Sequence, residues 1–206
     1  MIRRPISTIA IVVCLLSRVV QCQDKSNPQD GLVHDDALGI AFAKIGTVEQ
    51  SDSASYRITL RSSENSSARS GLAQISATDR LFVDLPGSYG GRLFLDTPSA
   101  SLLLHDRIFI DSVNTGQQIF RREYWTVYAG MGMWEGVINC STQQGGRYYI
   151  VSLLVQEPIG KPGEEVSGAP LKAGDLSRRL LNSLQDTTDV IVNEFTTLLT
   201  SVQIRK

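Results

Sequence analysis

The fold is constrained most by three apolar segments in the second half of the chain. Each segment is long enough for a strand. Their ranges are 119–128, 133–140 and 148–156, and all three are rich in the aromatic and β-branched side chains that strands favour. Gly130 and Gly132 separate the first pair, and residues 142–146 separate the second. Glycine adopts the positive φ angles that tight chain reversals require. The spacing therefore predicts an antiparallel meander.

Weaker strand signals precede this block. Tyr56, Ile58 and Leu60 alternate with polar residues, which places the three apolar side chains on one face of a half-buried strand. Two apolar runs within residues 80–96 flank a glycine-rich stretch, the pattern of a hairpin. Short strands are also expected at 102–104 and 108–113, with a turn at 114–116, and residues 37–47 suit either a strand or a short helix.

An amphipathic pattern closes the chain. Its apolar positions recur at steps of three, four and seven, as on one face of a helix, and they are Leu176, Leu180, Leu184, Ile191, Phe195, Leu198 and Val202. Asp175 is a suitable N-cap, and Arg205 and Lys206 suit the negative end of a helix dipole. We expect an amphipathic helix over residues 175–206, in which residues 186–189 could form a break and restart.

Proline and glycine recur through residues 157–174, so this segment is expected to be a linker or surface loop. It separates a predicted sheet domain, residues 37–156, from the C-terminal helix. The predicted fold class is α+β: a mostly antiparallel sheet of about six to eight strands, with the helix packed on one face. The alternative is that the helix docks on a partner or on a second copy of the chain.

The first 22 residues have the composition of an export signal. Arg3 and Arg4 precede an apolar run that Arg18 ends, and this run is shorter than the roughly 20 residues that span a bilayer. We expect the mature protein to work outside the cytosol, as a periplasmic or secreted protein. Residues 23–36 are polar and are expected to be a tether between the signal and the fold.

The end of the signal allows different outcomes. Cleavage after Cys22 would leave Gln23 as the first residue of a soluble protein. Alternatively, Cys22 would be the acylated first residue of an inner-membrane or outer-membrane lipoprotein, although Gln21 is larger than the residue that such signals place before the cysteine. An uncleaved anchor is the third outcome. Contact with a membrane is expected only through the signal or through a lipid on Cys22.

The charge and the cysteine content of the chain limit which ligands it can bind and which covalent links it can form. The chain has 20 basic and 21 acidic residues, and removing residues 1–22 takes away three arginines and no acid, which leaves 17 basic against 21 acidic residues. A mildly acidic chain without a basic run does not suit nucleic acid, because neutralising phosphates needs clustered Lys and Arg. Cys140 would be the one remaining thiol, so no intrachain disulfide is expected. We expect no cofactor and no metal site, because His34 and His105 lack nearby ligands at metal-binding spacing.

Aromatic residues concentrate between positions 124 and 149. The candidate binding residues are Tyr124, Trp125, Tyr128, Trp134 and Tyr148, with Arg121 and Arg122 beside them. Strand alternation places Tyr124 on the face of Arg122, and Trp125 on the opposite face. One set of rings is expected to pack in the core. The other set either meets the helix or is exposed as a contact surface, since Tyr, Trp and Arg supply much binding area.

These features favour a non-catalytic exported protein that binds another protein, as an envelope assembly factor, adaptor or inhibitor. The partner would be an envelope component or a second copy of the chain, and no residue is assigned a catalytic role. One alternative is a small extracytoplasmic hydrolase that uses His105 with Asp106 or Cys140. Another is a small-molecule carrier with a cavity between the sheet and the helix.

The mass of the mature chain tests the export signal. In protein purified from its native cell, we expect an intact mass that corresponds to residues 23–206 without modification. A lipid-sized increase carried by Cys22 would instead establish the lipoprotein. A chain that still begins at Met1 and is active in the cytoplasm would contradict export.

Overall fold

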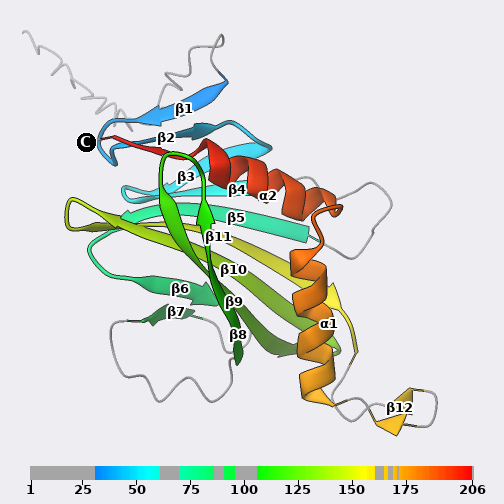
Figure 1. Ribbon diagram of the computed structural model, residues 1–206. Coiled ribbons are helices and arrows are strands. Elements are labelled where there is room, and N and C mark those ends of the chain that lie inside the picture. The colour runs from blue at the N-terminus through cyan, green and yellow to red at the C-terminus, as the bar shows by residue number, and fades with distance from the viewer. Residues whose placement is uncertain are drawn as a thin grey trace, which may run out of the picture.

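The computed structural model describes residues 31–60, 70–85, 91–95, 106–160, 165–166, 169–170 and 172–205. These residues form a seven-stranded antiparallel sheet, a three-stranded sheet, two hairpins and two helices (Figure 1). The predicted class, α+β with a mostly antiparallel sheet, is confirmed.

The large sheet has the strand order β3-β4-β5-β11-β10-β9-β8. Its strands are β3 (Thr47–Asp52), β4 (Ser55–Leu60), β5 (Ser70–Thr78), β8 (Asp106–Asn114), β9 (Ile119–Gly130), β10 (Met133–Gln144) and β11 (Arg147–Pro158). The small sheet contains β1 (Leu32–Asp35), β2 (Ile40–Ala43) and β14 (Gln203–Ile204). The hairpins are β6 (Phe82–Leu85) with β7 (Gly91–Phe94), and β12 (Glu165–Val166) with β13 (Ala169–Pro170). The helices are α1 (Ala173–Gln185) and α2 (Val190–Ser201).

The predicted meander is β9, β10 and β11, and both of its pairings are antiparallel. Met131 and Gly132 have φ angles of 50° and 80° at the first turn, and Gly145 and Gly146 have 61° and 80° at the second. Such paired positive φ angles match the right-handed twist of the strands that a two-residue turn connects. The glycines therefore set the registers of the three longest strands.

A second meander, β3-β4-β5, joins the first because β5 pairs with β11. The connection from β5 to β8 contains the β6–β7 hairpin, whose strand β6 contacts β10 and β11. Figure 1 shows this hairpin on the side of the sheet away from α1. This hairpin confirms the prediction for residues 80–96. The expected strand at residues 102–104 lies outside the described residues.

One face of the large sheet carries the main core. Its buried strand residues include Ile58, Ile75, Tyr124, Ile138, Val151 and Leu153. Helix α1 packs against β9 and β10, α2 packs against β2, β4 and β5, and the small sheet contributes Ile40 and Phe42 to the same core. The C-terminal helical segment therefore packs on the chain's own sheet.

The predicted C-terminal helix is two helices. Asp186 accepts hydrogen bonds from the backbone and hydroxyl of Thr188, and Asp189 caps α2 by accepting one from the Val192 backbone at 3.0 Å. The break falls within the residues predicted to restart a helix. The N-cap prediction for Asp175 is wrong, because α1 begins at Ala173 with Lys172 as its N-cap.

Three segments differ from expectation. Strand β1 begins at Leu32, inside the predicted tether, because it pairs with β2 along its whole length. The predicted linker contains the short β12–β13 hairpin. Arg205 follows β14 and does not end a helix, because the chain leaves α2 at Val202 and pairs with β2. Neither described helix combines the length and the apolar character that crossing a membrane requires.

At Gly71 in β5, the sheet backbone closely approaches a side chain of α2. A Cβ at this position would lie 2.3 Å from Cγ2 of Ile191, whose branched side chain is buried. We expect Gly71→Ala to lower the free energy of unfolding by about 1–3 kcal/mol through overpacking, measured by urea denaturation. Gly174→Ala is the matched control, since nothing lies within 4 Å of its added Cβ and alanine favours the helix by roughly 0.5–1 kcal/mol. Equal stability of the two variants would contradict this packing.

Candidate functional site

Three of the predicted binding residues are buried in the fold. Tyr124, Trp125 and Trp134 are 2%, 1% and 4% exposed. Tyr124 and Trp134 lie in the main core, whereas Trp125 packs with Val83 and Leu93 of the β6–β7 hairpin. The set of rings that includes Trp125 is thus covered by the hairpin, and neither the helix nor solvent, the two alternatives that the sequence left open, meets this side chain.

The other predicted binding residues have different contact partners. Arg121 forms an ion pair with Glu123 at 2.7 Å, and Arg122 donates to Asp111 of β8 at 2.8 Å. Tyr148 is half-buried, and the side chain of Tyr128 lies outside the described residues. The two arginines contact neighbouring carboxylates in the sheet, and the Arg122 guanidinium also lies 5.4 Å from the centroid of the Tyr124 ring.

Cys140 has the environment of a structural cysteine. It is fully buried in the main core, and burial raises the pKa of its thiol to about 12 because the thiolate would lose its hydration. His105, its proposed base, lies outside the described residues. Among the described residues, no three His, Cys, Asp or Glu side chains gather closely enough to hold a metal ion.

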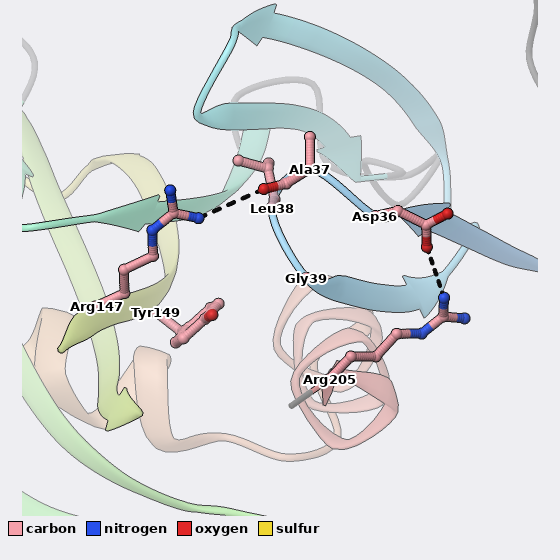
Figure 2. Close-up of a pocket in the computed structure, with 7 residues that line it drawn as sticks. All are labelled: Asp36, Ala37, Leu38, Gly39, Arg147, Tyr149 and Arg205. Carbon is pink, nitrogen blue, oxygen red and sulfur yellow. Dashed lines mark hydrogen bonds and ion pairs between the residues drawn. The ribbon is translucent and has the colours of Figure 1, made fainter. Parts of the chain in front are cut away.

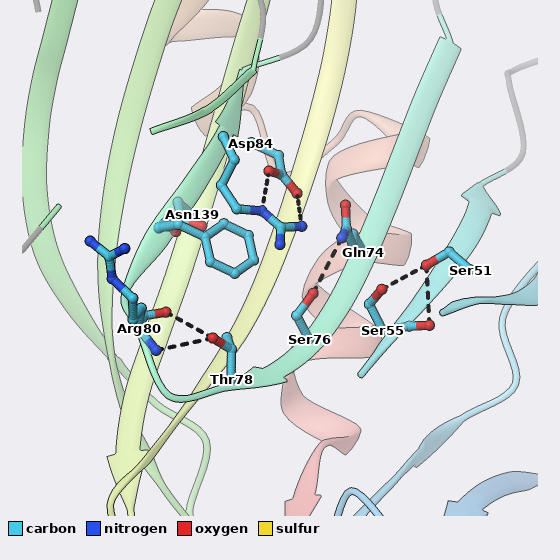
Figure 3. Close-up of polar contacts among 10 residues, drawn as sticks. Ser51, Ser55, Gln74, Ser76, Thr78, Arg80, Asp84 and Asn139 are labelled. Atoms are coloured by element: carbon cyan, nitrogen blue, oxygen red, sulfur yellow. Dashed lines mark hydrogen bonds and ion pairs between the residues drawn. The ribbon is translucent and has the colours of Figure 1, made fainter. Parts of the chain in front are cut away.

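The face of the sheet opposite the main core carries a row of polar side chains. Gln74, Ser152, Asn139 and Glu123 occupy paired register positions on β5, β11, β10 and β9. Asn139 is buried and donates to the Phe82 carbonyl at 3.3 Å, which ties the β6–β7 hairpin to this row. Figure 3 labels Asn139 and, near it in that view, Asp84 of β6. Its Oδ1 has no hydrogen-bond partner among the described residues.

Glu135, on the same face of β10, is also buried. Its Oε1 accepts from Gln156 at 2.7 Å, while its Oε2 has no partner in the described part of the chain. Burial raises the pKa of this carboxyl, and the Gln156 hydrogen bond opposes the shift.

Cation–π contacts and an ion pair connect residues of the β6–β7 hairpin. Arg92 lies 3.8 Å from the ring of Phe82 and pairs with Asp84, and Arg80 lies 3.9 Å from the ring of Phe94. These contacts join the two strands of the hairpin, whose Val83 and Leu93 pack against Trp125. This face is therefore built mainly for packing, with a few buried polar groups beneath the hairpin.

An open pocket of about 380 Å³ lies where the two ends of the described chain meet (Figure 2). Its walls come from the β1–β2 turn, from the start of β11 and from the residue after β14. The lining residues are Asp36, Ala37, Leu38, Gly39, Arg147, Tyr149 and Arg205.

Local backbone contacts hold the β1–β2 turn that forms one wall. Asp35 accepts a hydrogen bond from the Leu38 backbone at 2.9 Å, and Gly39 has a φ of 70°, which glycine adopts without strain. The Arg205 backbone N–H donates to the Gly39 carbonyl at 2.8 Å. The C-terminal strand therefore fixes the turn and brings Arg205 to the pocket.

The two guanidinium groups of the pocket differ in their partners. Arg205 donates to Asp36 Oδ1 at 2.8 Å and contacts His34 Nδ1 at 2.6 Å. Since a guanidinium only donates, His34 Nδ1 is the acceptor in this contact. Arg147 makes a single long hydrogen bond, 3.4 Å, to the Ala37 carbonyl, and no carboxylate among the described residues pairs with it. Arg147 thus retains donors that face the pocket.

Sequence reasoning missed this pocket. The sequence predicts Asp36 in the tether and Arg205 at a helix end, and 169 positions separate the two residues along the chain. Arg147 and Tyr149, two apart on one strand, share a face, and this spacing was the one local signal. A scan against known protein families finds no matching model, and a search of curated proteins finds no match.

The reactivity of the Cys140 thiol distinguishes a structural role of this cysteine from a role as a nucleophile. We expect iodoacetamide at pH 8 to leave Cys140 unmodified in the folded protein and to modify it fully in denaturant, as peptide mapping would show. Ser112→Cys is the control, because Ser112 is exposed on β8 and its replacement should react in the folded state. Rapid modification of native Cys140 would restore the nucleophile hypothesis.

Proposed function

We propose that this chain is an exported, non-catalytic protein that binds another protein, and that the partner contacts the pocket between the β1–β2 turn, β11 and Arg205. The observation that carries the proposal is the open pocket with a guanidinium, that of Arg147, which no described carboxylate neutralises. Charged groups of this kind at an open surface favour association with a group of opposite charge.

The burial of the aromatic residues supports the same choice. Because Tyr124, Trp125 and Trp134 stabilise the fold, a contact surface must use other residues. The pocket supplies two arginines, and arginine is enriched where proteins bind each other. A site that binds another protein suits the role of an assembly factor, adaptor or inhibitor.

A small-molecule carrier is the second candidate. The pocket volume of about 380 Å³ falls in the range of ligand sites, roughly 300–1,000 Å³. It lies beside the small sheet, however, and not between the large sheet and a helix, where a carrier cavity was expected. The hydrolase is less favoured, because Cys140 is buried with a raised pKa.

Site-specific photocrosslinking in the native cell tests the protein partner. A benzoylphenylalanine at Ala37, an exposed residue that lines the pocket, should give one discrete protein adduct, and Arg147→Gln in the same chain should abolish it. The probe placed at Asn182, exposed on α1, is the control and should give no such adduct. The same adducts from both positions, or no protein adduct from Ala37, would overturn the proposal.

A further inference from the structure

We infer that the pocket binds a single carboxylate group, held between the Arg147 guanidinium and the Tyr149 hydroxyl. The identity of the molecule that presents this carboxylate, a partner protein, rests on the function proposed above. The chemistry of the pocket itself rests on its donors, its charge and its shape.

The free polar groups of the pocket are mainly donors. Arg147 uses one N–H in a long bond to Ala37, although a guanidinium has five. The Tyr149 hydroxyl makes no hydrogen bond to the described residues, and it would lie 3.7 Å from a Cβ placed on Gly39, at the wall of the pocket. Figure 2 shows Tyr149 between the two arginines in that view. A ligand here must bring acceptors.

The net charge of the pocket suits a ligand that carries one negative charge. Arg147 and Arg205 bring two positive charges and Asp36 brings one negative charge, so one positive charge is uncompensated. Arg205 already donates to Asp36 and His34, whereas Arg147 pairs with no carboxylate among the described residues, so Arg147 carries the uncompensated charge that meets the ligand. A carboxylate carries one charge and matches the planar fork of a guanidinium, whereas a phosphate dianion would exceed the available charge.

The donors are held in place before any ligand arrives. Tyr149 is 6% exposed and packs in the main core, so its ring loses little freedom on binding. Arg147 stands two residues earlier on the same face of β11, and the β1–β2 turn opposite is fixed by its bond to Arg205. Gly39 keeps the space in front of the hydroxyl open, because it has no side chain.

NMR titration of the isotope-labelled full chain tests this inference. Acetate should shift the Arg147 Nε–Hε and Tyr149 ring signals in a saturable way. Arg147→Gln should weaken acetate binding about tenfold or more, since a charge-assisted hydrogen bond is lost. Tyr149→Phe should weaken it by a smaller factor. Arg57→Gln, an exposed arginine of β4 outside the pocket, is the control and should leave binding unchanged.

Two further probes identify the chemistry and its source. Inorganic phosphate should bind more weakly than acetate, and acetyl-dialanine with a free C-terminus should bind at least as tightly as acetate, while its amide should not bind. Absence of saturable shifts, tighter binding of phosphate, or unchanged binding in Arg147→Gln with wild-type amide signals elsewhere would overturn the carboxylate site. A crosslinked partner without acetate binding would support the proposed function and overturn the carboxylate site. Acetate binding without a crosslinked partner would support the carboxylate site and favour the carrier.

Discussion

The antiparallel pairing of β5 with β11 is the contact on which the rest of the structure depends. It joins the β3-β4-β5 and β8-β9-β10-β11 meanders into one sheet, with paired residues from Tyr148 and Thr78 to Gln156 and Ser70. Val151 and Leu153 of β11 are buried in the main core, and Ile150 is buried on the opposite face. A strand covered on both faces must be surrounded by other segments, so the two helices and the β6–β7 hairpin follow from this position.

Other segments cover both faces of the large sheet, and this determines where a partner can bind. The rings of Tyr124 and Trp134 meet the helical side, and Trp125 meets the hairpin, so the aromatic cluster contributes packing energy. The pocket lies instead at the start of β11, where the small sheet joins the N-terminal and C-terminal parts of the fold (Figure 2). There, polar side chains keep contact with solvent while the backbone beneath them is held by strand pairing.

Prediction from sequence was accurate where local pattern and tertiary structure agree. The three long strands, the alternation in β4 and the helix break before Asp189 follow from side-chain periodicity, glycine turns and capping. Strand β5 was missed, because its inward residues include small ones, Ala73 and Ala77, that give a weak hydrophobic signal. Strands β1 and β14 were missed because each is short and forms only by pairing with β2.

The sequence by itself determined the strand and helix periodicities, and with them which neighbouring residues share a face, since a strand repeats every two residues and a helix every 3.6. Only the tertiary structure decided what covers each face and which distant residues meet. Asp36 and Arg205 form an ion pair across 169 positions, because the C-terminal strand pairs with β2. No local pattern records such a contact, since its geometry depends on the packing of the whole chain.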